Sequence, residues 1–115
     1  MAISEYKTGT ATISTTEYSL IGTAGALASD TTDGVFQVFL DMNALLTGDE
    51  YELAVKEKAT SGGTQRLVFK ATIAGVQGSP IWVSPSLILM HGWDVTMDKI
   101  AGTDRSISWS VRQVA

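Results

Sequence analysis

Apolar residues recur at every second position along most of this 115-residue chain, which is the spacing of a β-strand with one face buried. Residues 49–58 show the spacing most plainly, because Tyr51, Leu53 and Val55 alternate with charged side chains. In residues 35–42 apolar side chains fall on both faces, which predicts a central strand covered on much of both sides. The composition agrees: Val, Ile and Thr, which pack well on a pleated surface, supply 31 residues.

Turn signals divide the chain into about eight strands. Ser61-Gly-Gly-Thr64 predicts a hairpin loop. Residues 93–111 predict a second hairpin, since two strands with matched apolar faces flank a turn at residues 101–104. Pro85 predicts an edge strand or a kink, because proline has no main-chain N–H to donate. The chain is therefore predicted to be all-β, a single antiparallel β-sandwich or jelly-roll-like domain spanning residues 1–115.

The N-terminal part gives a weaker pattern. Residues 6–14 and 17–21 predict two strands, the first rich in threonine. Residues 1–12 look too thinly apolar to be held by the core, so they are predicted to form a poorly anchored arm. Residues 22–33 hold small and polar side chains around one leucine and predict a flexible loop, since long loops without structure of their own are usually functional or disordered.

Composition excludes several classes of protein. The chain has no cysteine, which rules out disulfides, zinc ribbons and thiol catalysis. Its net charge of −4 disfavours binding to nucleic acid, which requires a basic footprint. The N-terminus lacks the apolar core of a signal peptide, and the longest apolar run, residues 87–90, is far too short to span a membrane. We therefore expect a soluble protein made in a cytoplasm, with neither nucleic acid nor membrane as a partner.

Charge is unevenly distributed along the chain. Residues 8–55 contain seven acids and no base, whereas residues 56–115 contain seven bases and four acids. In a Greek-key sandwich these halves interleave, so the asymmetry is either internal complementarity or one acidic and one basic face suited to head-to-side assembly. The sequence leaves both alternatives open.

No set of residues has the pattern of a catalytic or metal site. His91 is the only histidine and no serine lies in a nucleophile elbow, so we interpret His91 as a turn residue. Glu50 and Glu52 share a strand face as a glycosidase pair would, but such alternation is typical of any solvated strand. Asp30 and Asp33 lack the spacing of an EF-hand calcium loop. We predict that the chain is not an enzyme and binds no cofactor or metal.

The three tryptophans are assigned by their phase along the strands. Trp93 and Trp109 are in phase with core residues and are assigned to the core. Trp82 shares its strand face with Pro80 and Ser84, so it is the one tryptophan expected to face outward, toward a ligand such as a sugar or a protein partner.

Two stretches carry a family resemblance: residues 33–55 (DGVFQVFLDMNALLTGDEYELAV) and residues 92–112 (GWDVTMDKIAGTDRSISWSVR). Both resemble small virion proteins of tailed bacteriophages, in particular the sandwich-type decoration or cement proteins that coat capsids. The likeness covers roughly residues 33–114 and consists of strand patterns without an active-site signature.

The resemblance implies an enzymatically silent virion protein, made in the host bacterial cytoplasm, that stabilises a shell by bridging capsid subunits. Its expected partners are the major capsid protein and further copies of itself, as a dimer or trimer, since capsid positions are symmetric and the two halves are oppositely charged. Contacts are expected from the arm, the 22–33 loop and the outward tryptophan, with the candidate residues Tyr6, Lys7, Leu27, Asp30, Asp33 and Trp82. The alternatives are another virion sandwich, associated with the tail or a fibre, and a carbohydrate-binding module.

Overall fold

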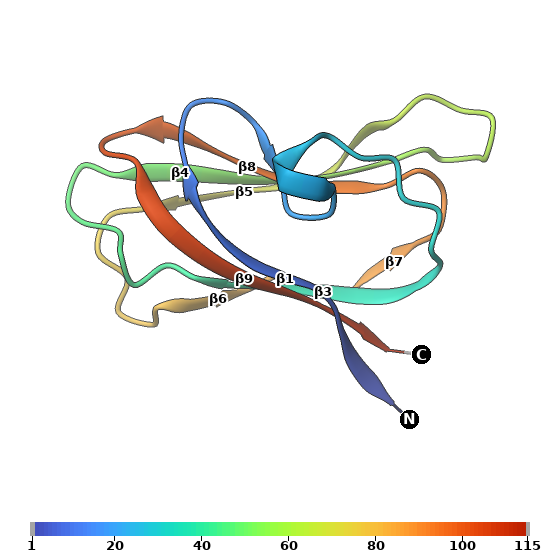
Figure 1. Ribbon diagram of the computed structural model, residues 1–115, viewed down its shortest axis with the longest axis horizontal. Coiled ribbons are helices and arrows are strands. Elements are labelled where there is room, and N and C mark those ends of the chain that lie inside the picture. Colours follow the sequence, from blue (N-terminus) through green and yellow to red (C-terminus); the bar gives the residue numbers. More distant parts are fainter. Residues whose placement is uncertain (1, 115) are drawn as a thin grey trace.

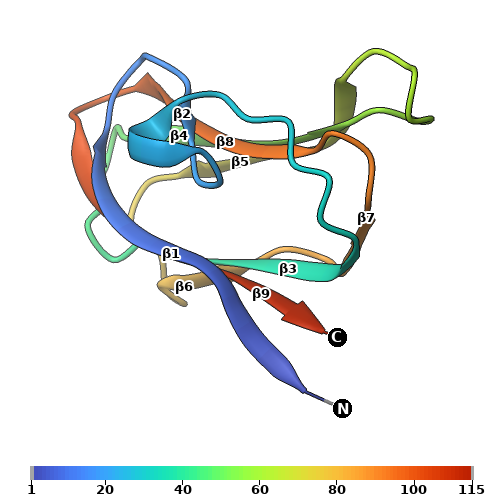
Figure 2. The same cartoon turned by 45° about the vertical axis from the view of Figure 1, so that its right-hand side comes forward.

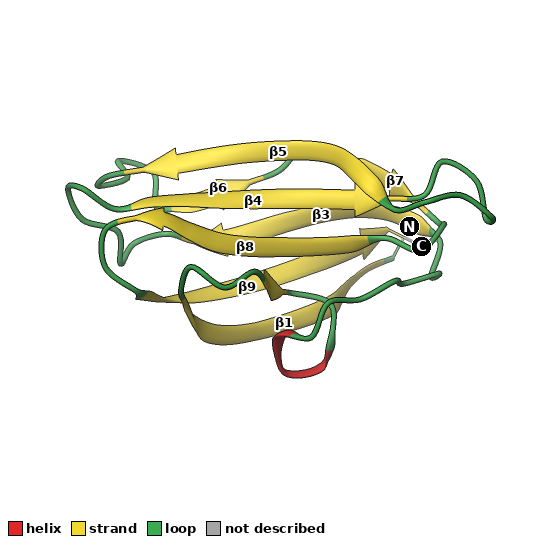
Figure 3. Ribbon diagram, turned by 90° about the horizontal axis from the view of Figure 1, so that it is seen from above, coloured by secondary structure: helices red, strands yellow, loops and turns green. Residues whose placement is uncertain are grey.

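Two antiparallel β-sheets pack face to face in the computed structural model, which describes residues 2–114 (Figure 1). Sheet A contains β1 (Ile3–Ile13), β9 (Arg105–Val114), β3 (Gly34–Asp41), β6 (Ile81–Val83) and β7 (Leu87–Leu89). Sheet B contains β2 (Tyr18–Ser19), β8 (Asp94–Ala101), β4 (Glu50–Glu57) and β5 (Arg66–Ala74). A short 3-10 turn, η1 (Thr23–Gly25), lies beside the β1 edge (Figure 3). The predicted all-β sandwich is confirmed.

The strand order is that of a jelly roll, because the chain pairs with itself from its ends inward. β1 pairs with β9, β2 with β8, β3 with β6 and β7, and β4 with β5. This nested ribbon folds over into two sheets with the orders β1-β9-β3-β6 and β2-β8-β4-β5, and β7 lies beside the other half of β3. Pro85 separates β6 from β7 on the edge of sheet A, as the proline predicted.

The core lies between the sheets and is filled by the alternating side chains that the sequence pattern predicted to point inward. The inward residues of the two central strands β3 and β4 are all buried: Phe36, Val38, Leu40, Tyr51, Leu53 and Val55. Trp93 and Trp109 are buried as predicted. The hairpin loop at residues 61–64 is also confirmed, since β4 and β5 pair directly.

The predicted hairpin at residues 93–111 is wrong. β8 belongs to sheet B and β9 to sheet A, so the turn between them crosses from one sheet to the other (Figure 1). Gly102 has a φ of +91°, and a Cβ at this position would collide with the side chain of Asp49. Asp49 in turn accepts hydrogen bonds from the Thr103 main chain (2.9 Å) and the Arg105 guanidinium (2.7 Å). The matched apolar faces therefore meet across the sandwich instead of lying side by side.

The N-terminal strand is more firmly built than its composition suggested. β1 pairs with β9 from Ile3, opposite Val114, to Ile13, opposite Arg105. Ile13 is fully buried and Tyr6 packs against the core. The prediction that residues 1–12 are too thinly apolar to be held is wrong for the described part, because main-chain pairing anchors the strand without a run of apolar side chains. A contact role for this segment stays a prediction.

Candidate partner-binding surfaces

Three of the predicted contact residues, Tyr6, Lys7 and Asp30, meet at the open edge between β1 and the 22–33 loop. The Tyr6 hydroxyl donates to Asp30 Oδ2 at 2.7 Å and shares a hydrogen bond with Thr32 Oγ1 at 2.8 Å. Lys7 Nζ lies 5.3 Å from the centre of the Tyr6 ring, which is within the distance of a cation–π contact. The arm and the loop therefore anchor each other.

This polar cluster keeps Asp30 charged. Burial opposes its ionisation, but the hydrogen bonds from Tyr6 and Thr32 and the charge of Lys7 outweigh burial, so the pKa of Asp30 lies below its ordinary value. Burial is also the main cause that raises the pKa of Tyr6, with the Asp30 carboxylate adding to it and the Thr32 hydroxyl acting against it. The phenol and the carboxylate form a donor–acceptor pair that is engaged within the molecule.

The 22–33 loop is tied to β8 at several points. Asp30 and Trp93 exchange two main-chain hydrogen bonds of 2.8 Å each, and Trp93 Nε1 donates to the Thr32 carbonyl at 2.8 Å. The Ala28 N–H donates to the buried carboxylate of Asp94 at 2.9 Å. The loop is therefore held by hydrogen bonds to its neighbours, which compensate for the small size of its side chains.

The other two candidate contact residues of the 22–33 loop are accessible to solvent. Leu27 is 63% exposed, and Asp33 is exposed beside the start of β3. The Asp33 carbonyl accepts a hydrogen bond from Gln113 Nε2 (3.1 Å), which joins the end of the loop to β9. The structure thus separates these two side chains from the Tyr6–Asp30 pair.

Trp82 faces the interior, contrary to its predicted outward orientation. It pairs in register with Leu40, whose side chain is fully buried, so both lie on the inner face of sheet A. Its ring stacks on Phe69 of sheet B with the centroids 6.5 Å apart. The neighbours Ile81 and Val83 are the exposed residues of β6. The outward prediction for Trp82 is wrong because this edge strand carries its aliphatic side chains, Ile81 and Val83, on the outer face.

A row of aliphatic side chains crosses the outer face of sheet A. Figure 1 shows that both termini lie at this end of the sandwich. The strand registers align Ile3 with Val114, Val114 with Val35 and Val35 with Ile88, so the row passes over β1, β9, β3 and β7. Ile88 is 81% exposed and Ile3 is 67% exposed. The only sign of this aliphatic row in the sequence is that residues 35–42 carry apolar side chains on both faces.

A hollow lies beside the aliphatic row. It has a volume of about 510 Å³ and is lined by residues of β3, β7, β9 and their ends: Asp33, Gly34, Val35, Ile88, Leu89, Met90, Gln113 and Val114. On the neighbouring part of the same face, the Arg112 guanidinium lies 3.7 Å from the centre of the Phe39 ring. This end of the face therefore exposes aliphatic side chains from four strands.

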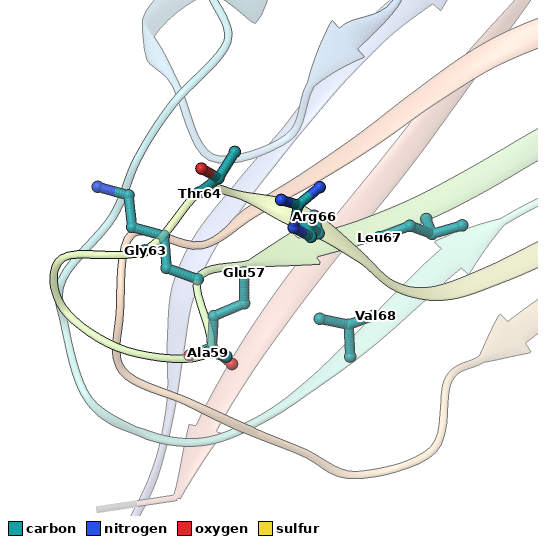
Figure 4. A pocket seen from close by; sticks show the side chains of 8 residues that line it. Glu57, Ala59, Gly63, Thr64, Arg66, Leu67 and Val68 are labelled. Carbon is teal, nitrogen blue, oxygen red and sulfur yellow. The ribbon is translucent and has the colours of Figure 1, made fainter.

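A second hollow, the hairpin hollow, lies at the projecting β4–β5 hairpin (Figures 2 and 4). Its volume is about 510 Å³, and its lining residues come from the end of β4, the loop and the start of β5: Glu57, Lys58, Ala59, Gly63, Thr64, Arg66, Leu67 and Val68. Charged and aliphatic side chains therefore share one concave surface.

Ion pairs join the acidic and the basic halves of the sequence. Acids from residues 8–55 meet bases from residues 56–115 in three of the ion pairs: Glu17–Lys56, Glu52–Lys70 and Asp49–Arg105. Because β4 lies between β5 and β8, the two halves of the chain interleave. This arrangement supports internal complementarity, and it removes one motive for expecting separate acidic and basic faces.

The remaining chemistry-bearing side chains serve local roles. Glu57 Oε2 accepts the main-chain N–H groups of Met90 (2.6 Å) and His91 (2.9 Å). Glu52 pairs with Lys70 at 3.2 Å. Among residues 2–114, no group of three or more acidic or histidine side chains is placed to hold a metal ion. No helix in this described range is long and apolar enough to cross a membrane.

Comparison of the chain with protein-family models, curated proteins and solved structures found no match.

Proposed function

We propose that this chain is a non-enzymatic structural protein of a phage particle, which binds and stabilises the capsid shell as a decoration or cement protein. The observation that carries the proposal is the aliphatic row on the outer face of sheet A, together with the resemblance of residues 33–114 to such proteins. Jelly rolls occur in viral capsids and also in lectins and cupins, so the fold alone does not select a function.

The aliphatic row suits a protein partner more than a small molecule. Its residues lie along a sheet face, and an exposed contiguous apolar patch on a small protein marks an interaction surface. Ile88 gains most from being covered, because 81% of its surface is open. Contacts of this kind are individually weak, but many copies bound to a lattice stabilise the whole shell by mass action.

Capsid binding tests the proposal. Particles that normally carry this chain are prepared without it, and wild type or Ile88→Ser is added back while the temperature of genome release is recorded. Wild type should raise that temperature, and Ile88→Ser should bind about tenfold more weakly or worse, since an isoleucine contact contributes about 1.5 to 3 kcal/mol. Val76→Ser is the matched control, because Val76 is 66% exposed and lies in the β5–β6 turn.

Two results would overturn the assignment. If wild type binds no capsid, a tail- or fibre-associated role in the virion takes precedence. If Ile88→Ser binds as tightly as Val76→Ser, the aliphatic row is not the contact surface. The carbohydrate-binding alternative depends on Trp82 as a sugar platform, and it is less favoured because this ring is partly buried and stacks on Phe69.

Self-association as a dimer or trimer belongs to the same proposal. Its support is now the aliphatic row, since homo-oligomer interfaces are more apolar than ordinary surface. Light scattering across micromolar concentrations should show a mass above 12.2 kDa for wild type and a smaller mass for Ile88→Ser. A wild-type monomer at the highest concentration would leave assembly to the capsid alone.

A further inference from the structure

Two of the eight basic side chains have no partner in the described part of the chain, and both line the hairpin hollow. Four others form ion pairs: Lys56, Lys70, Lys99 and Arg105. Lys7 and Arg112 lie over the rings of Tyr6 and Phe39. Lys58 and Arg66 form no ion pair with residues 2–114, although the chain carries a net charge of −4. Lys58 and Arg66 are therefore the two cations left available to an external anion, with Glu57 opposite Arg66 in the strand register.

The hairpin that carries these cations is held in place at its base. The Gln65 side-chain amide donates to the carbonyls of Ala28 (3.0 Å) and Gly92 (2.9 Å), which lie on two other segments. The Lys58 N–H donates to the His91 carbonyl at 3.0 Å. The Lys58 side chain also packs closely on Gly92, where a Cβ would lie 2.9 Å from Lys58 Cε. The base of the hairpin and the Lys58 stem are therefore positioned before any ligand arrives.

The hollow has one acid and an apolar wall. Glu57 is the only carboxylate that lines it, and one of its oxygens is occupied by the Met90 and His91 main chain. Leu67 and Val68 are 56% and 53% exposed, so the ligand gains from covering aliphatic surface as well as from pairing charges. In the view of Figure 4, Arg66, Leu67 and Val68 follow one another along the hollow.

We propose that the hairpin hollow binds an acidic segment of a partner protein, with carboxylates on Lys58 and Arg66 and aliphatic side chains on Leu67 and Val68. Charge complementarity selects an anion, and the exposed aliphatic wall selects a peptide over a free phosphate. Nucleic acid is a poorer fit, because two cations beside Glu57 make a small basic footprint. This site is separate from the aliphatic row, so it does not depend on the capsid proposal.

Titration of the isotope-labelled protein with a short probe peptide tests this inference by NMR. The probe is an amidated and acetylated peptide of alternating Asp and Leu residues, and the same peptide with Asn for Asp is its neutral counterpart. The acidic peptide should shift the amide signals of residues 57–68 saturably. Lys58→Gln combined with Arg66→Gln should weaken binding about fivefold, in the range expected for two exposed charge pairs.

The matched control is Lys70→Gln combined with Lys99→Gln, which removes the same charge elsewhere on the surface and should bind the peptide like wild type. The inference is overturned if the acidic peptide causes no saturable shift, if the neutral peptide binds equally well, or if both double variants behave alike. Tighter binding of a single-stranded oligonucleotide than of the acidic peptide would replace the protein partner by nucleic acid. None of these results bears on Ile88, so they are distinguishable from failure of the capsid assay.

Discussion

Aromatic side chains close both open edges of the sandwich, but the two edges are built differently. At the β1 edge, Tyr6 and Trp93 contact Phe36 with ring centroids 5.4 and 4.6 Å away, and both carry polar groups that bond to the 22–33 loop. At the opposite edge, Phe69 and Trp82 stack on each other, and neither ring makes a hydrogen bond within residues 2–114. The first edge combines packing with directional bonds, whereas the second relies on packing alone.

The difference shows how a segment of small residues can be held in one place. Stacked rings exclude water but tolerate sliding, because dispersion and burial are not directional. A phenol or indole N–H that is hydrogen-bonded to a loop requires the acceptor in a defined position, so the bonds from Tyr6 and Trp93 fix the loop that supplies the acceptors. The β1 edge can therefore order a loop of Gly, Ala, Ser and Thr, which has little apolar surface to bury.

The largest effect is expected from Trp93→Ala at the β1 edge. This substitution empties a fully buried site and should lower the free energy of unfolding by about 3 to 5 kcal/mol. It also removes the bond from Nε1 to the Thr32 carbonyl, so hydrogen exchange should speed up in residues 28–32 beyond the rest of the chain. Urea unfolding and amide exchange measure the two effects. A loss of stability without faster exchange in the loop would contradict the proposed difference between the edges.

A smaller effect is expected from Trp82→Ala at the other edge. The ring is partly buried against Phe69, so its removal should cost about 1 to 2 kcal/mol, with no local change in the 22–33 loop. Ile81→Ala is the matched control, because the adjacent side chain is 55% exposed and should cost less than about 0.5 kcal/mol. If urea melts find Ile81→Ala the more harmful of the two, the facing of β6 described above is wrong.

Tyr6→Phe isolates the polar part of the β1 edge. The ring stays while the hydroxyl and its bonds to Asp30 and Thr32 are lost, so the cost should be about 1 kcal/mol. Tyr18→Phe is the control, since Tyr18 is also half-buried and packs edge-on against Trp109 at 5.7 Å. Equal melting midpoints for the two variants would mean that the hydroxyl bonds of Tyr6 contribute nothing to stability.

The smallest effect is a dependence on pH that only the β1 edge should show. The pKa of Asp30 lies below its ordinary value of 3.8 in the folded protein, so its contribution to stability is present above that value and is lost as pH falls through the lowered one. The difference in unfolding free energy between wild type and Tyr6→Phe should therefore narrow as the pH falls from about 6 to about 3, a range that spans the ordinary carboxyl pKa. The gap for Trp82→Ala should stay constant over the same range. Urea melts at several pH values compare the two, and a constant Tyr6→Phe gap would argue against an ionised Asp30 as the acceptor.

Low pH should also destabilise the turn between β8 and β9, and it should do so equally in wild type and in all these variants. The hydrogen bond from Arg105, with those from the Thr103 and Leu46 main chains, holds the pKa of Asp49 at about 2. That stabilisation is lost as pH falls from about 4 toward 2. Every variant shares the pH dependence of the unfolding free energy that Asp49 causes. Differences in pH dependence between variants therefore still come from the two edges of the sandwich.

Local sequence determined where most strands run and which of their side chains are buried. The alternation in residues 35–42 and 49–58 is sufficient, because successive side chains of a strand point to opposite faces and only one choice buries Tyr51, Leu53 and Val55 together. The β4–β5 hairpin is predictable because Ser61-Gly-Gly-Thr64 is a turn signal between two alternating segments. The contact role of the arm and the loop stays a prediction, and the bonds from Tyr6 to Asp30 and Thr32 that join the two segments leave no signal in the sequence.

Only the tertiary structure decided which sheet each strand joins. A turn such as residues 101–104 brings two apolar faces together whether it closes a hairpin or crosses between sheets, and the choice depends on Asp49, about fifty residues earlier in the chain. Tertiary structure also decides the face of Trp82, because β6 packs its tryptophan on Phe69 of sheet B and leaves Ile81 and Val83 exposed. The anchoring of β1 was hidden as well, because main-chain pairing with β9 leaves no pattern in the side chains. The spacing of apolar residues shows which side chains of a strand are buried. Which neighbouring strands it pairs with is decided by contacts between residues far apart in sequence.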